Sequence, residues 1–362
     1  MKKLKIGILF GGKSAEHEVS LQSAKSIYKA IDRDKYEPVL IAINKKGEWK
    51  MREDNDFFVN PDDPEKIRLN DDSDSVAIVP QSSGRIINSR DSEPRDKVDV
   101  LFPILHGTYG EDGTVQGMIK LIDVPFVGAG VLGSSVGMDK DVMKRLLNET
   151  GVLNAKCLIA KEDDFPIFDE AEKVLGLPMF IKPANLGSSV GISKVRNAKE
   201  YVKAIKKAFL YDTKILIEEF IDGREIECAV LGNDEVESSI PGEVVVKSDF
   251  YSYEAKYVDS TAFELKIPAE IPENLQGTIK DLACRTFKTL CCEGMGRVDI
   301  FLCKNDILYV NEINTIPGFT KNSMYPKLWE ASGLSYKNLI TKLIDLAIER
   351  HKKEKSLKTT FK

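Results

Sequence analysis

The residues with the clearest chemical potential lie in segment 296–314, GRVDIFLCKNDILYVNEIN. Two strand-like runs flank a short polar break, which predicts a β-hairpin. A turn centred between Asn305 and Asp306 places Asp299 directly opposite Glu312 on the same face, because side chains alternate between faces along a strand. Two facing carboxylates repel each other unless positive charge lies between them, so this pair predicts a cation site.

The same register places Arg297 opposite Asn314 on that face of the hairpin. Two carboxylates and an amide oxygen are hard ligands that suit Mg²⁺ in contact with phosphates. Arg297 beside them is a candidate for neutralising negative charge in a transition state. The alternative is an exposed hairpin face with ordinary polar residues, and the spacing alone does not separate the two interpretations.

A second candidate site is the segment FIKPANLGSSVGISKV, in which Lys182 ends a buried strand and a glycine- and serine-rich loop follows at 187–191. Such a loop brings backbone N–H groups and hydroxyls close to phosphate oxygens, and a nearby lysine adds positive charge. Lys140, in GMDK just before a predicted helix, is a second phosphate-binding candidate. The alternatives are a plain turn and a solvated surface lysine.

Two further candidates follow predicted strands. Glu16 lies in FGGKSAEHEVSLQS, and His106 begins HGTYGEDG. Ligands of open parallel sheets bind beyond the carboxyl ends of the strands, where both residues are expected. The alternatives are that Ser20 caps the following helix, with the acidic residues at its dipole, and that His106 is structural.

These residues must be positioned by alternating strands and helices. Strands are predicted at 4–10, 36–43, 98–105, 178–181, 215–220 and 225–231, and helices near Ser20 and Thr114 and over 139–147, 279–290 and 336–352. The acidic, turn-rich region 54–96 predicts long loops or short edge strands. The N-terminal alternation indicates an open parallel sheet. A glycine-rich boundary near 127–133 and a third segment beginning near Asp222 predict domains over 1–127, 128–221 and 222–362.

Composition limits the class of protein. The 362 residues are 42% hydrophobic and 30% charged, which is typical of a globular chain. The net charge of −5 offers no basic excess for nucleic acid, and the apolar runs are too short to span a membrane. The six cysteines form no C-x-x-C pair, so we expect reduced thiols in a cytoplasmic protein.

Together these motifs closely resemble the D-Ala:D-Ala ligases of the ATP-grasp superfamily. The matching strings follow the order of that family over most of the chain: AEHEVSLQS, LHGTYGEDGTVQGM, GMDK, IKPANLGSSVGISKV, ILIEEFIDGREIE, YEAKY, GRVDIF and NEINTIPGFTKNSMYPKLW. The resemblance implies an α/β (α+β overall) fold with an N-terminal open parallel-sheet domain, a small central α+β domain and a C-terminal α+β domain with a mixed or antiparallel sheet.

The resemblance also implies a nucleotide site between the central and C-terminal domains. The residues around the ATP phosphates would be Lys140, Lys182, Ser188 and Ser189, and Lys256 would also bind the nucleotide. Glu218, Phe220 and Ile221 would line the adenine end, and Glu225 would bind the ribose hydroxyls. Asp299, Glu312 and Asn314 would hold two Mg²⁺ (or Mn²⁺) ions, as the hairpin pattern also indicates.

The substrate residues follow in the same way. Glu16 would bind the ammonium of the first D-alanine, near His106, and Tyr257 would connect to Glu16 through Ser188. The residues implied for the second step are Arg297 and the backbone of Gly318 at the tetrahedral intermediate, and Ser323 and Met324 at the carboxylate of the second D-alanine.

The implied reaction makes D-alanyl-D-alanine for peptidoglycan precursors in two steps. A D-alanine carboxylate attacks the γ-phosphate of ATP, and the amine of a second D-alanine then attacks the acyl phosphate. A D-serine or D-lactate acceptor is a close alternative, although Tyr257 argues against lactate. A non-catalytic ATP-binding module would predict loss of Arg297 or a metal ligand, and both are present. A homodimer is also expected.

Overall fold

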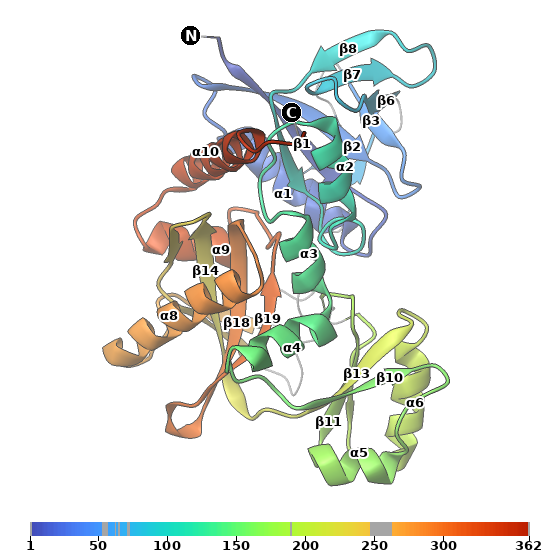
Figure 1. Cartoon of the computed structure of the whole chain (residues 1–362), viewed down its shortest axis with the longest axis vertical. Helices are drawn as coiled ribbons and strands as arrows, with labels where there is room; N and C mark the ends of the chain where they lie inside the picture. The colour runs from blue at the N-terminus through green and yellow to red at the C-terminus, as the bar shows by residue number, and fades with distance from the viewer. Residues whose placement is uncertain are drawn as a thin grey trace.

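The computed structural model describes residues 2–52, 57–61, 63, 66–70, 73–188, 190–246 and 263–360. Ser189, Lys256 and Tyr257, all implied to lie at the site, are outside the described residues. Figure 1 shows three regions stacked along the long axis, each built around its own sheet. None of the described helices is long and apolar enough to cross a membrane.

The N-terminal region contains a seven-stranded sheet in the order β8-β7-β6-β3-β2-β1-β9. Its parallel part is limited to β2, β1 and β9, which are Tyr36–Ile43, Leu4–Gly11 and Val100–Ile104. The antiparallel strands are β3 (Trp49–Met51), β6 (Asp74–Ile78), β7 (Arg85–Asn88) and β8 (Pro94–Lys97). The sheet is therefore mixed, and its antiparallel edge comes largely from the region predicted to hold loops and short edge strands. A separate hairpin pairs β4 (Phe58–Val59) with β5 (Arg68–Leu69).

Helix α1 (His17–Ala30) begins immediately after the first strand, and Glu16 is its N-cap residue. The alternative that Ser20 caps this helix is wrong, because Ser20 lies inside it. The Ser20 hydroxyl accepts the Gly11 N–H at 2.8 Å and donates to the Ile104 carbonyl oxygen. It thus joins the ends of β1 and β9, beside the loops that carry Glu16 and His106. Helix α2 (Thr114–Ile122) follows the second of these loops.

The central region is a four-stranded antiparallel sheet in the order β10-β13-β11-β12. Its strands are Cys157–Lys161, Lys214–Glu219, Met179–Pro183 and Ser193–Val195. Helices α5 (Phe168–Leu175) and α6 (Ala198–Ala208) pack on it. The loop between β11 and β12 is the predicted glycine- and serine-rich loop.

The C-terminal region is a six-stranded sheet whose neighbouring strands all run antiparallel. Its strands are β17 (Phe263–Lys266), β16 (Gly242–Val246), β14 (Gly223–Gly232), β18 (Gly294–Cys303) and β19 (Leu308–Asn314), with β15 (Val236–Ser238) beside β14. A 3₁₀ turn, Lys304–Asp306, joins β18 to β19. The associated helices are α8 (Glu273–Thr289), α9 (Met324–Ala331) and α10 (Tyr336–Lys355).

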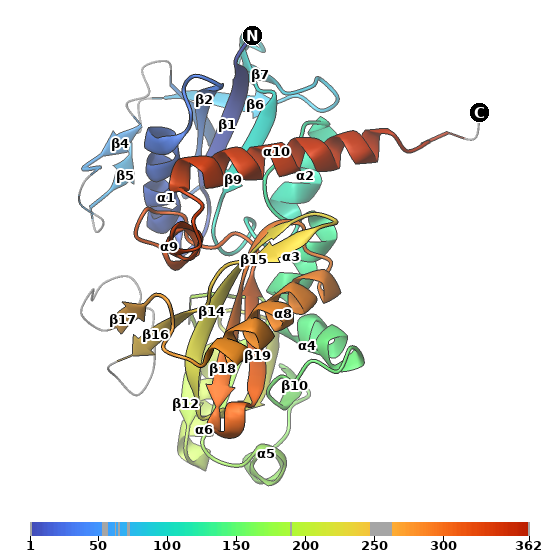
Figure 2. The same cartoon turned by 90° about the vertical axis from the view of Figure 1, so that its left-hand side faces the viewer.

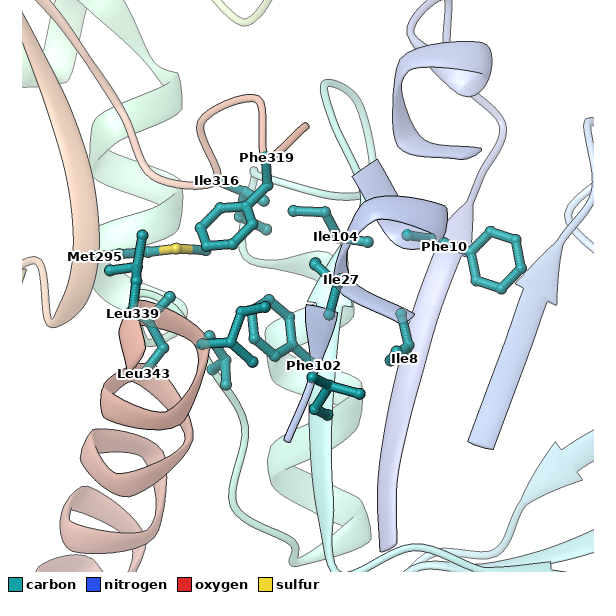
Figure 3. Close-up of a cluster of buried hydrophobic side chains, with 14 of the residues drawn as sticks. Ile8, Phe10, Ile27, Phe102, Ile104, Met295, Ile316, Phe319, Leu339 and Leu343 are labelled. Atoms are coloured by element: carbon teal, nitrogen blue, oxygen red, sulfur yellow. The ribbon is translucent and has the colours of Figure 1, made fainter. Parts of the chain in front are cut away.

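Two features connect the three regions. Helices α3 (Val131–Met138) and α4 (Lys140–Glu149) share a hydrophobic core with α8 and the six-stranded sheet rather than with the central sheet. Helix α10 lies across the N-terminal sheet in Figure 2, and Figure 3 shows Leu339 and Leu343 near Phe102 in one buried cluster. The domain boundaries after residues 127 and 221 stay predictions.

Candidate active site

The β18–β19 hairpin brings the predicted cation-binding residues to one face. Asp299 pairs with Glu312 and Arg297 with Asn314, as predicted. The Arg297 guanidinium donates to Asp299 through Nε to Oδ1 and Nη2 to Oδ2, both at 2.7 Å. Asn314 Nδ2 donates to Asp299 Oδ2 at 3.0 Å. The hairpin face is therefore an organised polar cluster and not a set of separate exposed side chains.

Two carboxylates of the neighbouring strand β14 join this cluster. Glu225 and Glu227 lie two residues apart, and Glu227 pairs directly with Asp299 across the β14–β18 ladder. Carboxylate oxygens of Glu225, Glu227 and Asp299 all lie within 4.8 Å of one another. A concentration of hard oxygen donors at this separation fits a divalent cation such as Mg²⁺ or Mn²⁺.

Three lysines surround the junction between the central sheet and the hairpin. Lys140, at the start of α4, lies 3.1 Å from Glu312 and donates to the Leu186 carbonyl oxygen at 2.8 Å. Lys182 on β11 lies 2.8 Å from Glu218 on β13, and Lys144 approaches the other oxygen of Glu218 at 3.3 Å. Lys140 therefore connects the glycine-rich loop to the hairpin.

Glu218 is a buried carboxylate held by two cations. It is 3% exposed. Burial alone raises the pKa of this carboxyl, but the charges of Lys182 and Lys144 outweigh burial and hold it below its usual value. Lys182 and Lys144 together carry more positive charge than Glu218 neutralises, in a site that otherwise contains many acidic residues. A polyphosphate bound here would meet Lys182, whereas the Lys144 side chain is buried.

An aromatic surface lies at the edge of the central sheet beside Glu218. The rings of Phe180 and Phe220 have centroids 6.1 Å apart, and Lys194 Nζ lies 4.4 Å from the Phe220 ring centre. Phe220 is partly exposed and the following Ile221 is half-buried. An exposed aromatic edge of this kind offers a stacking surface for a flat ring.

The glycine-rich loop reaches the N-terminal region at Glu16. The Ser188 hydroxyl donates to Glu16 Oε1, and Ser188 has a positive φ of 52°. Gly107 also lies against Glu16, since a Cβ there would come within 2.7 Å of Glu16 Oε2, and its φ is +72°. A cleft of about 510 Å³ runs beside this contact and is lined by Lys13, Ser14, Glu16, Lys45, Gly187 and Tyr211, among others.

His106 holds a C-terminal loop rather than pointing into open space. Its Nδ1 donates to the Ile316 carbonyl oxygen at 2.9 Å, and Nε2 contacts the Ser23 hydroxyl at 3.2 Å. Ser23 in turn accepts the Phe319 N–H at 3.3 Å. Burial lowers the pKa of His106, so the ring is neutral at pH 7. His106 and Ser23 thus fix the backbone on both sides of Gly318.

Glu111 completes this contact from the same N-terminal loop. It accepts the Ile316 N–H at 3.0 Å and the Gly107 N–H at 2.8 Å. Both backbone groups of Ile316 are therefore bound by side chains of the N-terminal region. The loop that carries Gly318 is held in one conformation against the loop that carries His106.

Ser323 and Met324 lie at the start of α9, close to Gly318. The Ser323 hydroxyl accepts the Thr320 N–H at 3.1 Å, and a Cβ on Gly318 would come within 3.2 Å of it. Met324 is 6% exposed, and its side chain belongs to the hydrophobic core. Its contribution to a binding site would therefore come from its backbone.

Several residues of the site were not predicted from the sequence, among them Lys144, Glu111 and Glu227. Lys144 follows Lys140 by one helical turn, so the (i, i+4) spacing places both on one helix face. Glu227 follows Glu225 by two residues, which places both on one strand face. No spacing in the sequence indicates the role of Glu111, because that role depends on a contact with Ile316, which lies 205 positions away.

The half-buried Glu111 predicts a pH-dependent stability. Burial, together with repulsion from Glu16, raises the pKa of Glu111 to about 8, while the bonds from Gly107 and Ile316 act in the opposite direction. Between the ordinary value of 4.5 and about 8, the folded state holds a proton that the unfolded state has lost. The free energy of unfolding should therefore fall as pH rises through this range, by up to about 1.4 kcal/mol per pH unit.

Urea unfolding between pH 7 and 8 checks this expectation. The pKa of His106 is lowered by burial, so its titration lies below this window. Glu111→Gln cannot lose a proton and should show a flatter dependence of stability on pH than the unmodified protein. Equal slopes in the two proteins would show that Glu111 does not titrate in this range.

Comparisons with known proteins agree with this geometry. Two family models match the chain, one described as D-ala D-ala ligase N-terminus over residues 5–129 and one as D-ala D-ala ligase C-terminus over residues 146–345. A curated D-alanine–D-alanine ligase of Oceanobacillus iheyensis is 52% identical over 363 residues, which cover 99% of each chain.

Solved structures give the same result at the level of the fold. The D-alanine–D-alanine ligase of Coxiella burnetii has a TM-score of 0.85 at 36% identity, covering 98% of this chain and 97% of its own. The VanG D-Ala:D-Ser ligase of Enterococcus faecalis has a TM-score of 0.83 at 35% identity, with 96% and 100% covered. The Bacillus anthracis D-alanine–D-alanine ligase complexed with ATP has a TM-score of 0.72 at 26% identity, with 97% and 99% covered.

Proposed function

The chain belongs to the D-alanine–D-alanine ligase family, and we propose that the residues described above form the site at which it joins two D-alanine molecules. The chain is an enzyme of this activity, which makes a dipeptide for peptidoglycan synthesis. The observation that carries the proposed site is the meeting of Arg297, Asp299 and Glu312 with Lys140 at the junction of the central and C-terminal sheets.

ATP is proposed to lie between these two sheets. Lys140 and Lys182 contact its phosphates, with Ser188 in the loop beside them, and Glu225 binds the ribose hydroxyls. The adenine lies at the aromatic edge, which holds Glu218, Phe220 and Ile221. The Bacillus anthracis relative, which shares this fold and is complexed with ATP, supports binding of ATP by this chain.

Asp299, Glu312 and Asn314 are proposed to hold two Mg²⁺ or Mn²⁺ ions. Bound divalent ions would neutralise phosphate charge in both steps of the reaction. The β18–β19 register supports this assignment because it places Asp299 opposite Glu312, with Asn314 in contact with Asp299. Lys140 beside Glu312 balances part of the acidic charge of this face.

Glu16 binds the ammonium of the first D-alanine and so orients its carboxylate toward the γ-phosphate. A carboxylate oxygen attacks the phosphorus, ADP leaves, and an acyl phosphate forms. The amine of the second D-alanine then attacks the acyl carbon, phosphate leaves with its oxygen, and the amine loses a proton. Arg297 and the Gly318 N–H stabilise the oxyanion of the tetrahedral intermediate. The contacts of His106, Ser23 and Glu111 keep the Gly318 loop in place.

The second D-alanine is proposed to bind at Ser323 and the backbone of Met324. The VanG relative has the same fold, so the fold alone does not fix the acceptor. A phosphate-release assay with ATP and D-alanine, D-serine or D-lactate tests the choice. We expect release with D-alanine alone, with D-alanyl-D-alanine as the product. Release only when D-serine or D-lactate is added would assign a different acceptor.

We further propose that the enzyme acts as a homodimer in the cytoplasm, where ATP is available. The described cysteines are all free thiols, which is consistent with a reducing compartment. Light scattering coupled to size-exclusion chromatography gives the mass in solution. A mass of a single 40.5 kDa chain would contradict the dimer.

Lys182→Ala should chiefly raise the KM for ATP, by about 10-fold or more, because a lysine that contacts phosphate in ground and transition states gives uniform binding. The fold should persist, since Lys144 still pairs with the buried Glu218. Initial rates at varied ATP and saturating D-alanine measure the effect. Lys203→Ala, which removes an exposed lysine from α6, is the matched control and should leave KM unchanged. An unchanged ATP dependence in Lys182→Ala would place this lysine outside the nucleotide site.

A further inference from the structure

Glu227 is a buried carboxylate at the site that the reaction described above does not use. It lies on β14, is 4% exposed and pairs with Asp299 across the ladder. Its Oε2 lies 2.9 Å from Nε of Arg297. A buried carboxylate is costly unless it is paired, and the guanidinium lies close enough to pair with Glu227 by charge.

Arg297 is therefore held between two carboxylates on adjacent strands. Asp299 accepts through both oxygens, from Nε and Nη2, and Glu227 lies against Nε from β14. The Arg297 side chain is 16% exposed, so its charge depends on these partners rather than on water. With two negative partners, the guanidinium can lose one without becoming an unpaired buried cation.

The proposed metal role of Asp299 makes the second partner necessary. Both Asp299 oxygens accept hydrogen bonds from Arg297 in this structure. A cation bound by Asp299 would take at least one of these oxygens and would repel the guanidinium. Asp299 alone would then favour departure of Arg297 at the point when the reaction needs it. The contact between Glu227 and Arg297 involves neither Asp299 oxygen, because Glu227 approaches from the neighbouring strand β14. It can therefore persist when a cation binds Asp299.

We propose that Glu227 is a positioning residue that keeps the Arg297 guanidinium in the site when Asp299 binds the cation. Although its carboxylate belongs to the same group of oxygens as Asp299, its role in this proposal is to hold Arg297 and not to bind the metal. This inference rests on the proposed roles of Arg297 and Asp299.

Glu227→Gln keeps the shape of the side chain and removes its charge. We expect kcat to fall by about 10- to 100-fold, as misplacement of a reacting group typically produces, with KM for ATP changed by less than about twofold. The matched control is Glu243→Gln, which removes a buried carboxylate from another arginine pair on the same sheet, Arg224–Glu243 at 2.7 Å, in which the arginine is exposed. The control should keep kcat near that of the unmodified enzyme. A kcat unchanged in Glu227→Gln would overturn the inference.

A double-mutant cycle separates positioning from a general structural effect. If Glu227 acts through Arg297, then Arg297→Ala and Arg297→Ala/Glu227→Gln should have the same kcat within about threefold. If the double variant instead had a kcat lower than that of Arg297→Ala by the same factor as Glu227→Gln alone, the inference would be refuted. Should the glutamine variant fail to fold, Glu227→Asp makes the same test, because it keeps the charge and withdraws the carboxylate from Nε.

A binding measurement excludes a role as metal ligand. With ADP present, saturating Mn²⁺ should raise the Tm of Glu227→Gln as much as that of the unmodified protein, while Asp299→Asn should lose this rise. Loss of the rise in Glu227→Gln would make Glu227 a ligand and overturn the inference. If the unmodified protein makes no dipeptide, the proposed function fails, whereas a dipeptide-forming enzyme indifferent to Glu227→Gln overturns the inference alone.

Discussion

Glu312→Gln is expected to lower kcat by about 100-fold or more at ordinary Mg²⁺ while leaving the fold intact. Glu312 lies opposite Asp299 on the hairpin face and is 3.1 Å from Lys140. A neutral amide oxygen is a much weaker ligand for Mg²⁺ than a carboxylate. The substitution changes one atom and little volume, so the loss should appear in catalysis and not in stability.

The Mg²⁺ dependence of the rate makes this test specific. A weakened ligand raises the Mg²⁺ concentration needed for half-maximal rate, and higher Mg²⁺ should restore part of the activity. Glu237→Gln, on the exposed side of β15, removes one charge elsewhere on the same sheet and should change neither quantity. A near-normal rate of Glu312→Gln at ordinary Mg²⁺ would show that Glu312 is not a metal ligand.

The predicted pairing within the hairpin that carries Glu312 is correct because two errors compensate. The predicted register near the turn was wrong by one residue, and a β-bulge was not predicted. The predicted turn paired Asp299 with Glu312, and this pair is confirmed. The actual connection is the 3₁₀ turn Lys304–Asp306, and near it the register differs by one residue from the predicted one. Leu302 faces Leu308 there, whereas the predicted register placed it opposite the following residue.

The register then shifts between Asp299 and Ile300, at a β-bulge that leaves Asn311 unpaired between Val310 and Glu312. This extra residue on β19 restores the predicted alignment at the charged residues, since a bulge moves every later residue by one position. Sequence patterns cannot locate such a bulge, because nothing in the alternation of polar and apolar residues marks Asn311. The face that carries the acids was therefore predictable, but the mechanism that aligns it was not.

Contacts between residues that lie far apart in the sequence could not be predicted from local patterns. Strand and helix positions depend on local periodicity, and the predicted strand 36–43 coincides with β2. Ser188 lies against Glu16 although 172 positions separate them, and this contact came from the family resemblance rather than from the pattern of residues. Glu111 and Glu227 act through partners on other elements, so their roles required the fold itself.

Arg297→Lys is expected to lower kcat by about 100- to 1000-fold, the loss seen when an oxyanion-stabilising group is removed. Lysine keeps the positive charge, so the carboxylates of Asp299 and Glu227 retain a buried counter-charge and the protein should fold. Its single ammonium cannot reproduce the planar guanidinium, which contacts both oxygens of Asp299 at 2.7 Å and Glu227 at 2.9 Å. Arg297→Ala would remove the cation that lies against both carboxylates, which costs roughly 3–5 kcal/mol, whereas lysine keeps the charge and tests the geometry of the guanidinium.

The matched control is Arg224→Lys, because Arg224 also binds a carboxylate through Nε and Nη2, at 2.7 Å each, on the same sheet. It lies outside the proposed site, and kcat should stay close to that of the unmodified enzyme. Steady-state rates at saturating ATP and D-alanine, with thermal unfolding of each variant, measure both effects. If Arg297→Lys turned over normally, a positive charge alone would be enough at this position. The directional hydrogen bond to the oxyanion would then come from the Gly318 N–H, which the contacts of Ile316 with His106 and Glu111 hold in place.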